Sequence, residues 1–273
     1  MMLQRLKGNH YLFLISYKNI MKVVILSGGF GTRISEYTSL IPKPMIRIGD
    51  KPIIEHIMEI YSKSGFNEFY LALGYKSEVI KEYFYNYEFL NSNFKINLED
   101  GKVTPYESTK KKWNIHLIDT GINTMTGGRI KRLKKYIDNE TFLLTYGDAV
   151  TDLDISKVIK FHKSHGKMVT VTGVRPPARF GELTINDKNE VLEFKEKPNI
   201  QHGWINGGFF VIEPEFLNLI NDDACILEKE PLEKVAKDNE LVAFLHEGFW
   251  QCIDTKRDKD NLEDIIKSGI KRW

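Results

Sequence analysis

The stretch that decides the fold is VVILSGGFGTR, residues Val23 to Arg33. It begins with the run VVILS at 23–27, which is apolar until its last residue. Such a run is typical of a strand buried inside a parallel sheet. Glycines and Arg33 follow at once. Glycine tolerates positive φ, exposed N–H groups in succession form an anion nest, and arginine adds a permanent charge. The stretch therefore predicts a polyphosphate site, or alternatively a tight strand–helix turn with a solvated arginine.

Strand-like and helix-like segments alternate after this stretch. Apolar strand-like runs lie at 68–75, 113–121, 142–148 and 168–174, and helical spacing of apolar residues lies at 52–65, 76–87, 127–136 and 154–166. This alternation predicts right-handed crossovers and an α/β fold with a doubly wound, mainly parallel sheet. Ligands of such sheets bind at the carboxyl ends of the strands, where residues 28–33 and Gly147-Asp148 fall.

The remaining segments predict the domain organisation. Residues 1–20 are partly basic and partly apolar, and we expect an upstream extension with little order; a secretory signal is the alternative, but no small-residue cleavage site follows. Residues 88–112 are polar and lack helical spacing, which predicts a hairpin or an oligomer contact. Short strand-like runs after Arg175 predict a small β-rich region. We expect residues 21–273 to form one domain.

Composition argues against several classes of function. The net charge is 39 − 37 = +2, so a general nucleic-acid binder is not expected, and no stretch reaches the length of a transmembrane helix. Two cysteines are too few for a disulfide framework or a zinc site, and they favour the cytoplasm. The glycine pattern matches neither G-x-x-x-x-G-K-[ST] nor G-x-G-x-x-G, which leaves a P-loop protein and an NAD dehydrogenase unsupported.

Several short motifs together resemble a known family, the sugar-1-phosphate nucleotidyltransferases. These motifs are G-G-x-G-T-R at 28–33, P-K-P at 42–44, Y-G-D at 146–148, E-K-P at 196–198 and N-G-G at 206–208. The resemblance covers residues 21–273, and TMTGGRIKR at 124–132 and GFWQCIDTKRD at 248–258 look most like its cytidylyltransferases. It implies that residues 21–174 mainly bind a nucleotide and that 175–273 mainly bind a sugar phosphate.

The same resemblance implies a reaction and its participants. CTP and a sugar 1-phosphate, glucose 1-phosphate above all, would be joined with release of pyrophosphate, and the product would feed deoxysugars of cell-surface polysaccharide. Mg²⁺ would be the cofactor, and the protein would be a cytoplasmic homo-oligomer without nucleic-acid or membrane partners. Another nucleotide or sugar 1-phosphate remains the first alternative, and a nucleotide-sugar-sensing protein without catalysis remains the second.

Three charged residues are the predicted catalytic residues: Arg33, Lys43 and Asp148. Prolines on both sides fix the backbone of Lys43, so its ammonium can be aimed at the α-phosphate. Arg33 would bind the departing pyrophosphate. Asp148 and Asp254 would hold Mg²⁺, which prefers one or two carboxylates plus water. The alternative for Asp254 is a helix cap over the polar segment that follows it.

The remaining predicted contacts come from glycine-rich or polar motifs. The nucleotide-binding residues are Leu26, Gly28, Gly29, Gly31, Thr32, Arg33, Lys43, Thr124, Thr126, Gly127 and Arg129; the sugar-phosphate residues are Glu196, Lys197, Asn206, Gly207 and Gly208. A helix that begins at Gly127 would present free N–H groups to an anion. Glycines inside the strand at 204–214 would leave room for a sugar ring. For Lys131 and Arg132, an exposed basic face is as good an interpretation as contact with the nucleotide.

Overall fold

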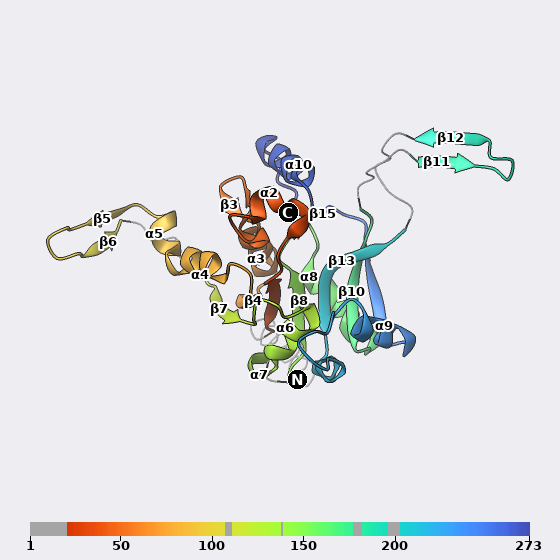
Figure 1. Cartoon of the computed structure of the whole chain (residues 1–273), viewed down its shortest axis with the longest axis horizontal. Helices are drawn as coiled ribbons and strands as arrows, with labels where there is room; N and C mark the ends of the chain where they lie inside the picture. The colour runs from red at the N-terminus through yellow and green to blue at the C-terminus, as the bar shows by residue number, and fades with distance from the viewer. Residues whose placement is uncertain (1–20, 107–110, 138, 177–181, 196–202) are drawn as a thin grey trace, which may run out of the picture.

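The computed structural model describes residues 21–106, 111–137, 139–176, 182–195 and 203–273, and the predicted extension at 1–20 lies outside them (Figure 1). A seven-stranded sheet forms its centre, in the order β14-β10-β13-β8-β1-β4-β7. These strands are β1 (Val23–Ser27), β4 (Glu68–Leu73), β7 (Asn114–Asp119), β8 (Phe142–Tyr146), β10 (Val169–Val174), β13 (Ile205–Ile212) and β14 (Leu241–His246). Only β13 runs antiparallel to its neighbours, which confirms the mainly parallel sheet.

The order of the strands places a topological switch point beside the glycine-rich stretch. From β1 the chain builds outward through β4 to β7 on one side, and β8 lies on the other side of β1. Both β4 and β8 pair with β1 in parallel. The carboxyl ends of β1 and β8 therefore open at one crevice, which is where doubly wound sheets bind their ligands.

Helices cover both faces of the sheet, as the alternation of segments predicts. One face carries α3 (Ile53–Lys63), α4 (Ser77–Tyr85), α8 (Ile155–His165) and α10 (Lys256–Lys267); the other carries α6 (Thr126–Arg132), α7 (Lys134–Ile137), α9 (Glu230–Lys237) and the 3₁₀ helix η3 (Pro214–Leu219). Strand β1 shows the pattern, because Val23 and Ile25 pack into the first core and Val24 and Leu26 into the second. The predicted helix at 127–136 is two short helices, α6 and α7.

Two hairpins extend from opposite sides of the body (Figure 1). One pairs β5 (Phe94–Ile96) with β6 (Val103–Pro105) after the short helix α5 (Tyr87–Asn91), and it confirms a hairpin within 88–112. The other pairs β11 (Glu182–Ile185) with β12 (Val191–Lys195). Among the described residues, no helix combines the length and the apolar character that crossing a bilayer would need.

The remaining elements are short. They are η1 (Thr32–Ile34), α2 (Ser35–Thr38), η2 (Lys43–Met45), β2 (Arg47–Ile48), β3 (Lys51–Pro52), β9 (Ala149–Thr151) and β15 (Trp250–Cys252). Of these, η1, η2, β9 and β15 contribute residues to the crevice. Asp154 accepts a hydrogen bond from the N–H of Ser156 and so caps α8, as its position predicts. The most important of these elements for the site are β9 and β15, which pair with each other.

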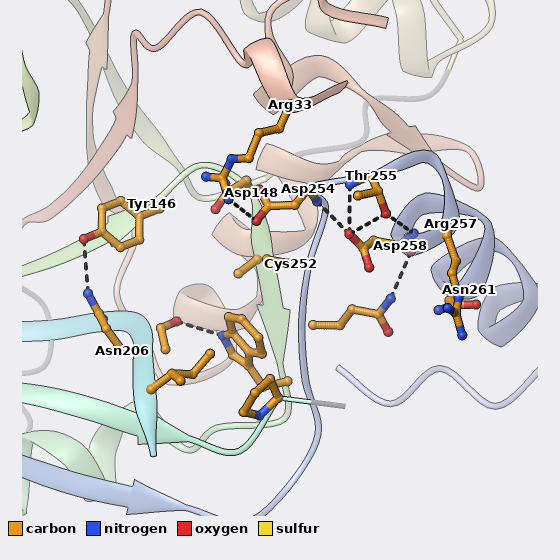
Figure 2. A pocket seen from close by; sticks show the side chains of 16 residues that line it. Arg33, Tyr146, Asp148, Asn206, Cys252, Asp254, Thr255, Arg257, Asp258 and Asn261 are labelled. Atoms are coloured by element: carbon orange, nitrogen blue, oxygen red, sulfur yellow. Dashed lines mark hydrogen bonds and ion pairs between the residues drawn. The ribbon is translucent and has the colours of Figure 1, made fainter. Parts of the chain in front are cut away.

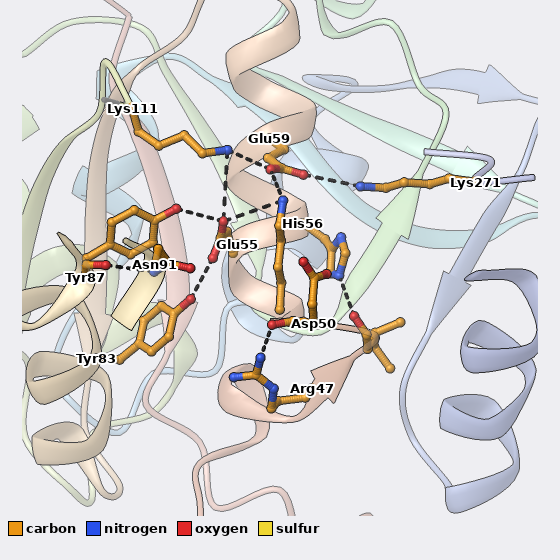
Figure 3. Close-up of polar contacts among 12 residues, drawn as sticks. Arg47, Asp50, Glu55, His56, Glu59, Tyr83, Tyr87, Asn91, Lys111 and Lys271 are labelled. Atoms are coloured by element: carbon orange, nitrogen blue, oxygen red, sulfur yellow. Dashed lines mark hydrogen bonds and ion pairs between the residues drawn. The ribbon is translucent and has the colours of Figure 1, made fainter. Parts of the chain in front are cut away.

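A polar cluster on α3 joins this helix to α4, α5 and Lys111, which flank the first hairpin in the sequence (Figure 3). The Glu55 side chain is 1% exposed and accepts hydrogen bonds from the hydroxyls of Tyr83 and Tyr87 at 2.6 and 2.9 Å. One turn further, Glu59 accepts from the ammonium groups of Lys51 and Lys111 at 2.7 and 2.8 Å. Burial alone would raise the pKa of Glu59, but these ammonium groups lower it to about 2.

We expect Glu59→Gln to make the stability of the protein less dependent on pH. Because the folded-state pKa of Glu59 lies below its ordinary value of 4.5, the carboxylate stabilises the fold above pH 4.5 and loses this effect as the pH falls towards 2. The free energy of unfolding should drop by about 3 kcal/mol at pH 7, at ~1.4 kcal/mol per pKa unit, and the difference from wild type should shrink below pH 4.5.

Urea denaturation between pH 3 and pH 7 measures this difference. Glu99→Gln, at an exposed position in the β5–β6 hairpin, is the matched control and should follow the wild-type profile. A Glu59→Gln protein whose stability falls with pH in parallel with wild type would contradict the assignment.

Candidate active site

Two cavities meet at the carboxyl ends of β1 and β8. The glycine-turn cavity, of about 630 Å³, is lined by residues 26–33, Lys43, Pro44, residues 122–126, Arg129, residues 146–148 and Glu228. The Trp250 cavity, of about 760 Å³, is lined on its other sides by Asn206, Gly207, Trp250, Asp254 and α10 residues such as Asn261. Arg33, Tyr146 and Asp148 line both cavities. A ligand in one cavity would therefore reach a ligand in the other.

The pairing of β9 with β15 brings Asp148 and Asp254 together. Asp148 directly precedes β9, Asp254 follows β15 by two residues, and Cys252 pairs with Ala149 in the antiparallel register. The N–H of Ile253 extends this pairing by donating to the carbonyl of Asp148 at 2.9 Å. Two aspartates that lie far apart in the sequence thus face the same crevice, as the motifs predict.

Arg33 and Lys43 form an ion cluster with these aspartates. The Lys43 ammonium donates to Asp148 Oδ2 at 2.5 Å and to Asp254 Oδ1 at 2.8 Å. The Arg33 guanidinium lies 2.5 Å from Asp254 Oδ2, and Figure 2 shows this pair among the side chains that line the Trp250 cavity. Burial alone would lower the pKa of Lys43, but the two carboxylates more than offset it and raise that pKa.

The two cations differ in their freedom to move. The Lys43 side chain is 12% exposed, and η2 holds its backbone between Pro42 and Pro44, as the sequence predicts. The Arg33 side chain is 73% exposed, so it can turn towards a ligand at little cost. The largely buried cation Lys43 thus lines the glycine-turn cavity, and the exposed cation Arg33 lines both cavities.

The helix cap that competes with a metal role for Asp254 belongs to its neighbour. Thr255 is the N-cap of α10 and forms a capping box with Asp258, whose carboxylate also accepts from the N–H of Asp254. Since Thr255 supplies the cap, the Asp254 carboxylate is directed to the ion cluster (Figure 2).

Buried Arg129 explains one glycine of the turn. Its side chain is 4% exposed, and a Cβ atom on Gly28 would lie 2.3 Å from Arg129 Nη1. The guanidinium donates to five acceptors at 2.7–3.2 Å: Gly28 O, Leu73 O, Thr120 Oγ1, Gly121 O and Ile122 O. Arg129 lines the glycine-turn cavity and holds the turn against the end of β4. A direct contact with a nucleotide stays a prediction.

The N-terminus of α6 differs from the prediction. The helix begins at Thr126, and the N–H groups of Gly127 and Gly128 bond to the carbonyl of Cys225 at 3.0 and 3.2 Å. They are therefore not free for an anion. A Cβ atom on Gly127 would lie 2.8 Å from that carbonyl, so the glycine makes room for a chain segment, and it does not line the glycine-turn cavity.

The glycines of β13 also have structural reasons. A Cβ atom on Gly207 would lie 2.7 Å from Val174, and one on Gly208, where φ is +81°, would lie 2.5 Å from the ring of Tyr146. Packing, and not the approach of a sugar, is the reason the structure gives for them. Asn206 and Gly207 do line the Trp250 cavity, whereas Gly208 does not.

The other residues considered from the sequence fall into three groups. Leu26, Gly28, Gly29, Gly31, Thr32, Thr124 and Thr126 line the glycine-turn cavity. Lys131 donates to the carbonyl of Asn221 and Arg132 forms an ion pair with Asp223, so both belong to an exposed basic face that holds a neighbouring segment. Glu196 and Lys197 lie outside the described residues.

The donor chemistry of the crevice fits a hard divalent cation. Asp148 and Asp254 supply carboxylate oxygens, and the ammonium of Lys43 lies between them, which shows that the pair accommodates a cation. No cluster of three or more His, Cys, Asp or Glu residues suited to a metal occurs in the described part of the chain. Two carboxylates with water match the preference of Mg²⁺.

Three of the cavity-lining residues that sequence reasoning missed make hydrogen bonds within the site. Tyr146 stands directly before the Gly147-Asp148 motif and contacts both cavities, so its position was the available signal. The Trp250 indole donates to the carbonyl of Gly207 at 2.8 Å and lies inside a motif that the resemblance uses. Glu228 lies in a polar segment without a motif, and no sequence pattern indicated it.

The fold and this site define a class of protein, and comparison with known proteins agrees with it. The chain belongs to the nucleotidyl transferase family, whose model matches residues 22–258, and it is a nucleotidyltransferase. It is 49% identical over 254 residues to glucose-1-phosphate cytidylyltransferase of Salmonella typhimurium, covering 93% of this chain and 98% of that protein. A probable glucose-1-phosphate cytidylyltransferase of Bacillus subtilis is 43% identical, with 93% and 99% covered.

Solved structures confirm the fold. HddC from Yersinia pseudotuberculosis, solved with GMP-PN, superimposes with a TM-score of 0.66 at 25% identity, covering 90% of this chain and 100% of that one. A UDP-glucose pyrophosphorylase solved with UDP-glucose gives 0.64 at 17% identity, with 92% and 99% covered, and it shares the fold. The predicted family and α/β fold class are thus confirmed.

Proposed function

We propose that this protein is a glucose-1-phosphate cytidylyltransferase, which converts CTP and α-D-glucose 1-phosphate into CDP-glucose and pyrophosphate. The observation that carries the proposal is the junction of two cavities at Arg33, Tyr146 and Asp148, with Lys43 and Asp254 beside it. The relatives with 43–49% identity carry this activity in their names. The glycine-turn cavity would take CTP, and the Trp250 cavity would take the sugar phosphate.

The reaction needs neutralisation of the phosphate charges and does not need a nucleophilic side chain. A phosphate oxygen of glucose 1-phosphate attacks the α-phosphorus of CTP, the new P–O bond forms, and the bond to the β-phosphate oxygen breaks to release pyrophosphate. Two unit charges 4 Å apart repel by ~4 kcal/mol at an effective dielectric constant of about 20. Lys43 would stabilise the charge that builds at the α-phosphate, and mobile Arg33 would bind the leaving pyrophosphate.

Asp148 and Asp254 would hold Mg²⁺ in the same crevice. When bound, the ion supplies positive charge to the phosphate oxygens of the nucleotide. The two carboxylates would then release Lys43 and Arg33 to the substrates. The chain's own cations and its metal ligands thus exchange partners when the reactants bind.

Initial rates with CTP, UTP, GTP and dTTP against glucose 1-phosphate test the proposal. We expect kcat/KM with CTP to exceed the others at least tenfold, which corresponds to ~1.4 kcal/mol of transition-state discrimination. Mannose 1-phosphate and galactose 1-phosphate extend the test to the sugar. A preference for GTP, UTP or dTTP would overturn the assignment of the base.

The setting of the enzyme follows from the same proposal. We infer a cytoplasmic homo-oligomer without nucleic-acid or membrane partners, whose product serves deoxysugar synthesis for cell-surface polysaccharide. Phe94, Ile96 and Leu98 are exposed on the first projecting hairpin, where a second subunit would cover them. The division into a nucleotide-binding part, 21–174, and a sugar-phosphate-binding part, 175–273, also stays a proposal.

A further inference from the structure

Glu228 lines the glycine-turn cavity beside Tyr146, which lines both cavities, although no motif marks it. Its Oε2 accepts a hydrogen bond from Thr126 Oγ1 at 2.7 Å, and its Oε1 accepts one from the hydroxyl of Tyr146 at 2.6 Å. Tyr146 Oη in turn accepts from Asn206 Nδ2 at 3.3 Å (Figure 2). One carboxylate therefore joins a residue of the glycine-turn cavity to a residue of the Trp250 cavity through a single tyrosine.

The segment that carries Glu228 is firmly placed. The N–H groups of Met125 and Gly127 donate to the carbonyls of Asp223 and Cys225 at 2.8 and 3.0 Å. The N–H of Leu227 donates to Thr126 Oγ1 at 2.9 Å, so the hydroxyl that binds Glu228 is itself oriented by the backbone beside it. Glu228 is thus held at the start of α6 by contacts that do not depend on a bound substrate.

Tyr146 is equally restricted. Its ring lies against Gly208, where any side chain would collide with it, and it packs edge-on against Phe210 with ring centroids 6.1 Å apart. The Tyr146 hydroxyl donates to the Glu228 carboxylate at 2.6 Å. The ring has little freedom, and the direction of the hydroxyl depends on its acceptor.

The Glu228 carboxylate would repel a polyphosphate in the same cavity, so its position relative to the cations matters. Thr126 belongs to the side of the glycine-turn cavity formed by residues 122–126, and the cations Arg33 and Lys43 belong to the turn and to η2. Glu228 therefore sits with the neutral hydroxyls of Thr126 and Tyr146, whereas Arg33 and Lys43 are paired with the aspartates. Its charge strengthens both of its hydrogen bonds relative to those of a neutral acceptor.

We propose that Glu228 is a positioning residue that couples the two cavities, because it fixes Thr126 on the nucleotide side and Tyr146, and through it Asn206, on the sugar-phosphate side. This inference rests on the proposed function for the assignment of the cavities. It predicts that a change on one side alters the binding of the substrate on the other side. A residue that only stabilised the fold would have no such effect.

Steady-state kinetics of three variants test the coupling. Tyr146→Phe should raise the KM of glucose 1-phosphate about fivefold, the size expected for one lost hydrogen bond. Glu228→Gln, which replaces a charged acceptor with a neutral one, should raise this KM by less, and the double variant should be no worse than Tyr146→Phe alone. Thr126→Val should raise the KM of glucose 1-phosphate as well as that of CTP, although Thr126 lies in the other cavity. Glu230→Gln, an exposed change two residues away, is the matched control and should leave both KM values unchanged.

The outcomes separate this inference from the proposed function. Additive effects of Glu228→Gln and Tyr146→Phe, or a Thr126→Val protein with an unchanged KM for glucose 1-phosphate, would overturn the coupling. A lower melting temperature with unaltered KM values would do the same. All variants are measured with the nucleotide and sugar phosphate that the wild-type protein turns over fastest. If the wild-type protein does not prefer CTP, the proposed function is refuted, but the comparison between variants still tests the coupling.

Discussion

Replacing Asp148 with asparagine is expected to reduce the rate of pyrophosphate release by a factor on the order of 10²–10³. Asparagine keeps the size of the side chain and can still accept the hydrogen bond from Lys43, which is 2.5 Å away in the wild type. It removes the negative charge that would hold Mg²⁺ against the phosphates. The loss of one preorganised electrostatic partner of a transition state costs about this much.

Pyrophosphate release and thermal unfolding are measured on the same protein. The second measurement distinguishes a loss of activity from a loss of folding. Asp152→Asn is the matched control, since Asp152 lies four residues further on, pairs with His246 and lines neither of the two cavities. This control should keep wild-type turnover. If Asp148→Asn retained more than about a tenth of wild-type activity, the assigned role of this carboxylate would be wrong.

Replacing Lys43 with methionine is expected to lower kcat/KM by a factor on the order of 10²–10³ and, at the same time, to strengthen metal binding in the absence of nucleotide. The activity falls because the ammonium no longer stabilises charge at the α-phosphate. The metal binds more tightly because the cation that lies between Asp148 and Asp254 is gone. These opposite changes come from one substitution.

Titration with Mn²⁺ followed by electron paramagnetic resonance measures the second effect without any turnover. Lys76→Met is the matched control, because the ammonium of Lys76 donates to the carbonyls of Ser39 and Leu40 and does not line either cavity. Its Mn²⁺ affinity should equal that of wild type. An unchanged Mn²⁺ affinity of Lys43→Met would show that Lys43 and the metal do not share these carboxylates.

The sheet could be predicted because its strands leave strong local patterns. Strand β1 is apolar from Val23 to Leu26 because its side chains pack into both cores. The apolar residues of α3 and α8 recur at helical spacing because they pack into one core. The pairing of β9 with β15 could not be predicted, because three-residue strands about a hundred residues apart show no periodicity. That pairing nevertheless brings the two aspartates together.

The site was predictable where charge and backbone rigidity coincide, as at Lys43 between its prolines. It was not predictable where a residue acts through another. Gly28 reads as a ligand contact, but its lack of a side chain also makes room for Arg129, which is 101 residues away in the chain. Glu228 has no motif at all, because its position depends on a segment that docks through backbone hydrogen bonds.

The ion cluster also determines which solutes the resting enzyme attracts. Arg33 and Lys43 carry two positive charges and Asp148 and Asp254 two negative ones, so these four side chains sum to zero before substrates arrive. Inorganic phosphate would have to break the ion pairs between these cations and aspartates, so we expect it to bind weakly. A triphosphate that arrives together with its own divalent ion can satisfy the cations and the carboxylates at once. We therefore expect the crevice to favour a triphosphate with its divalent ion over inorganic phosphate.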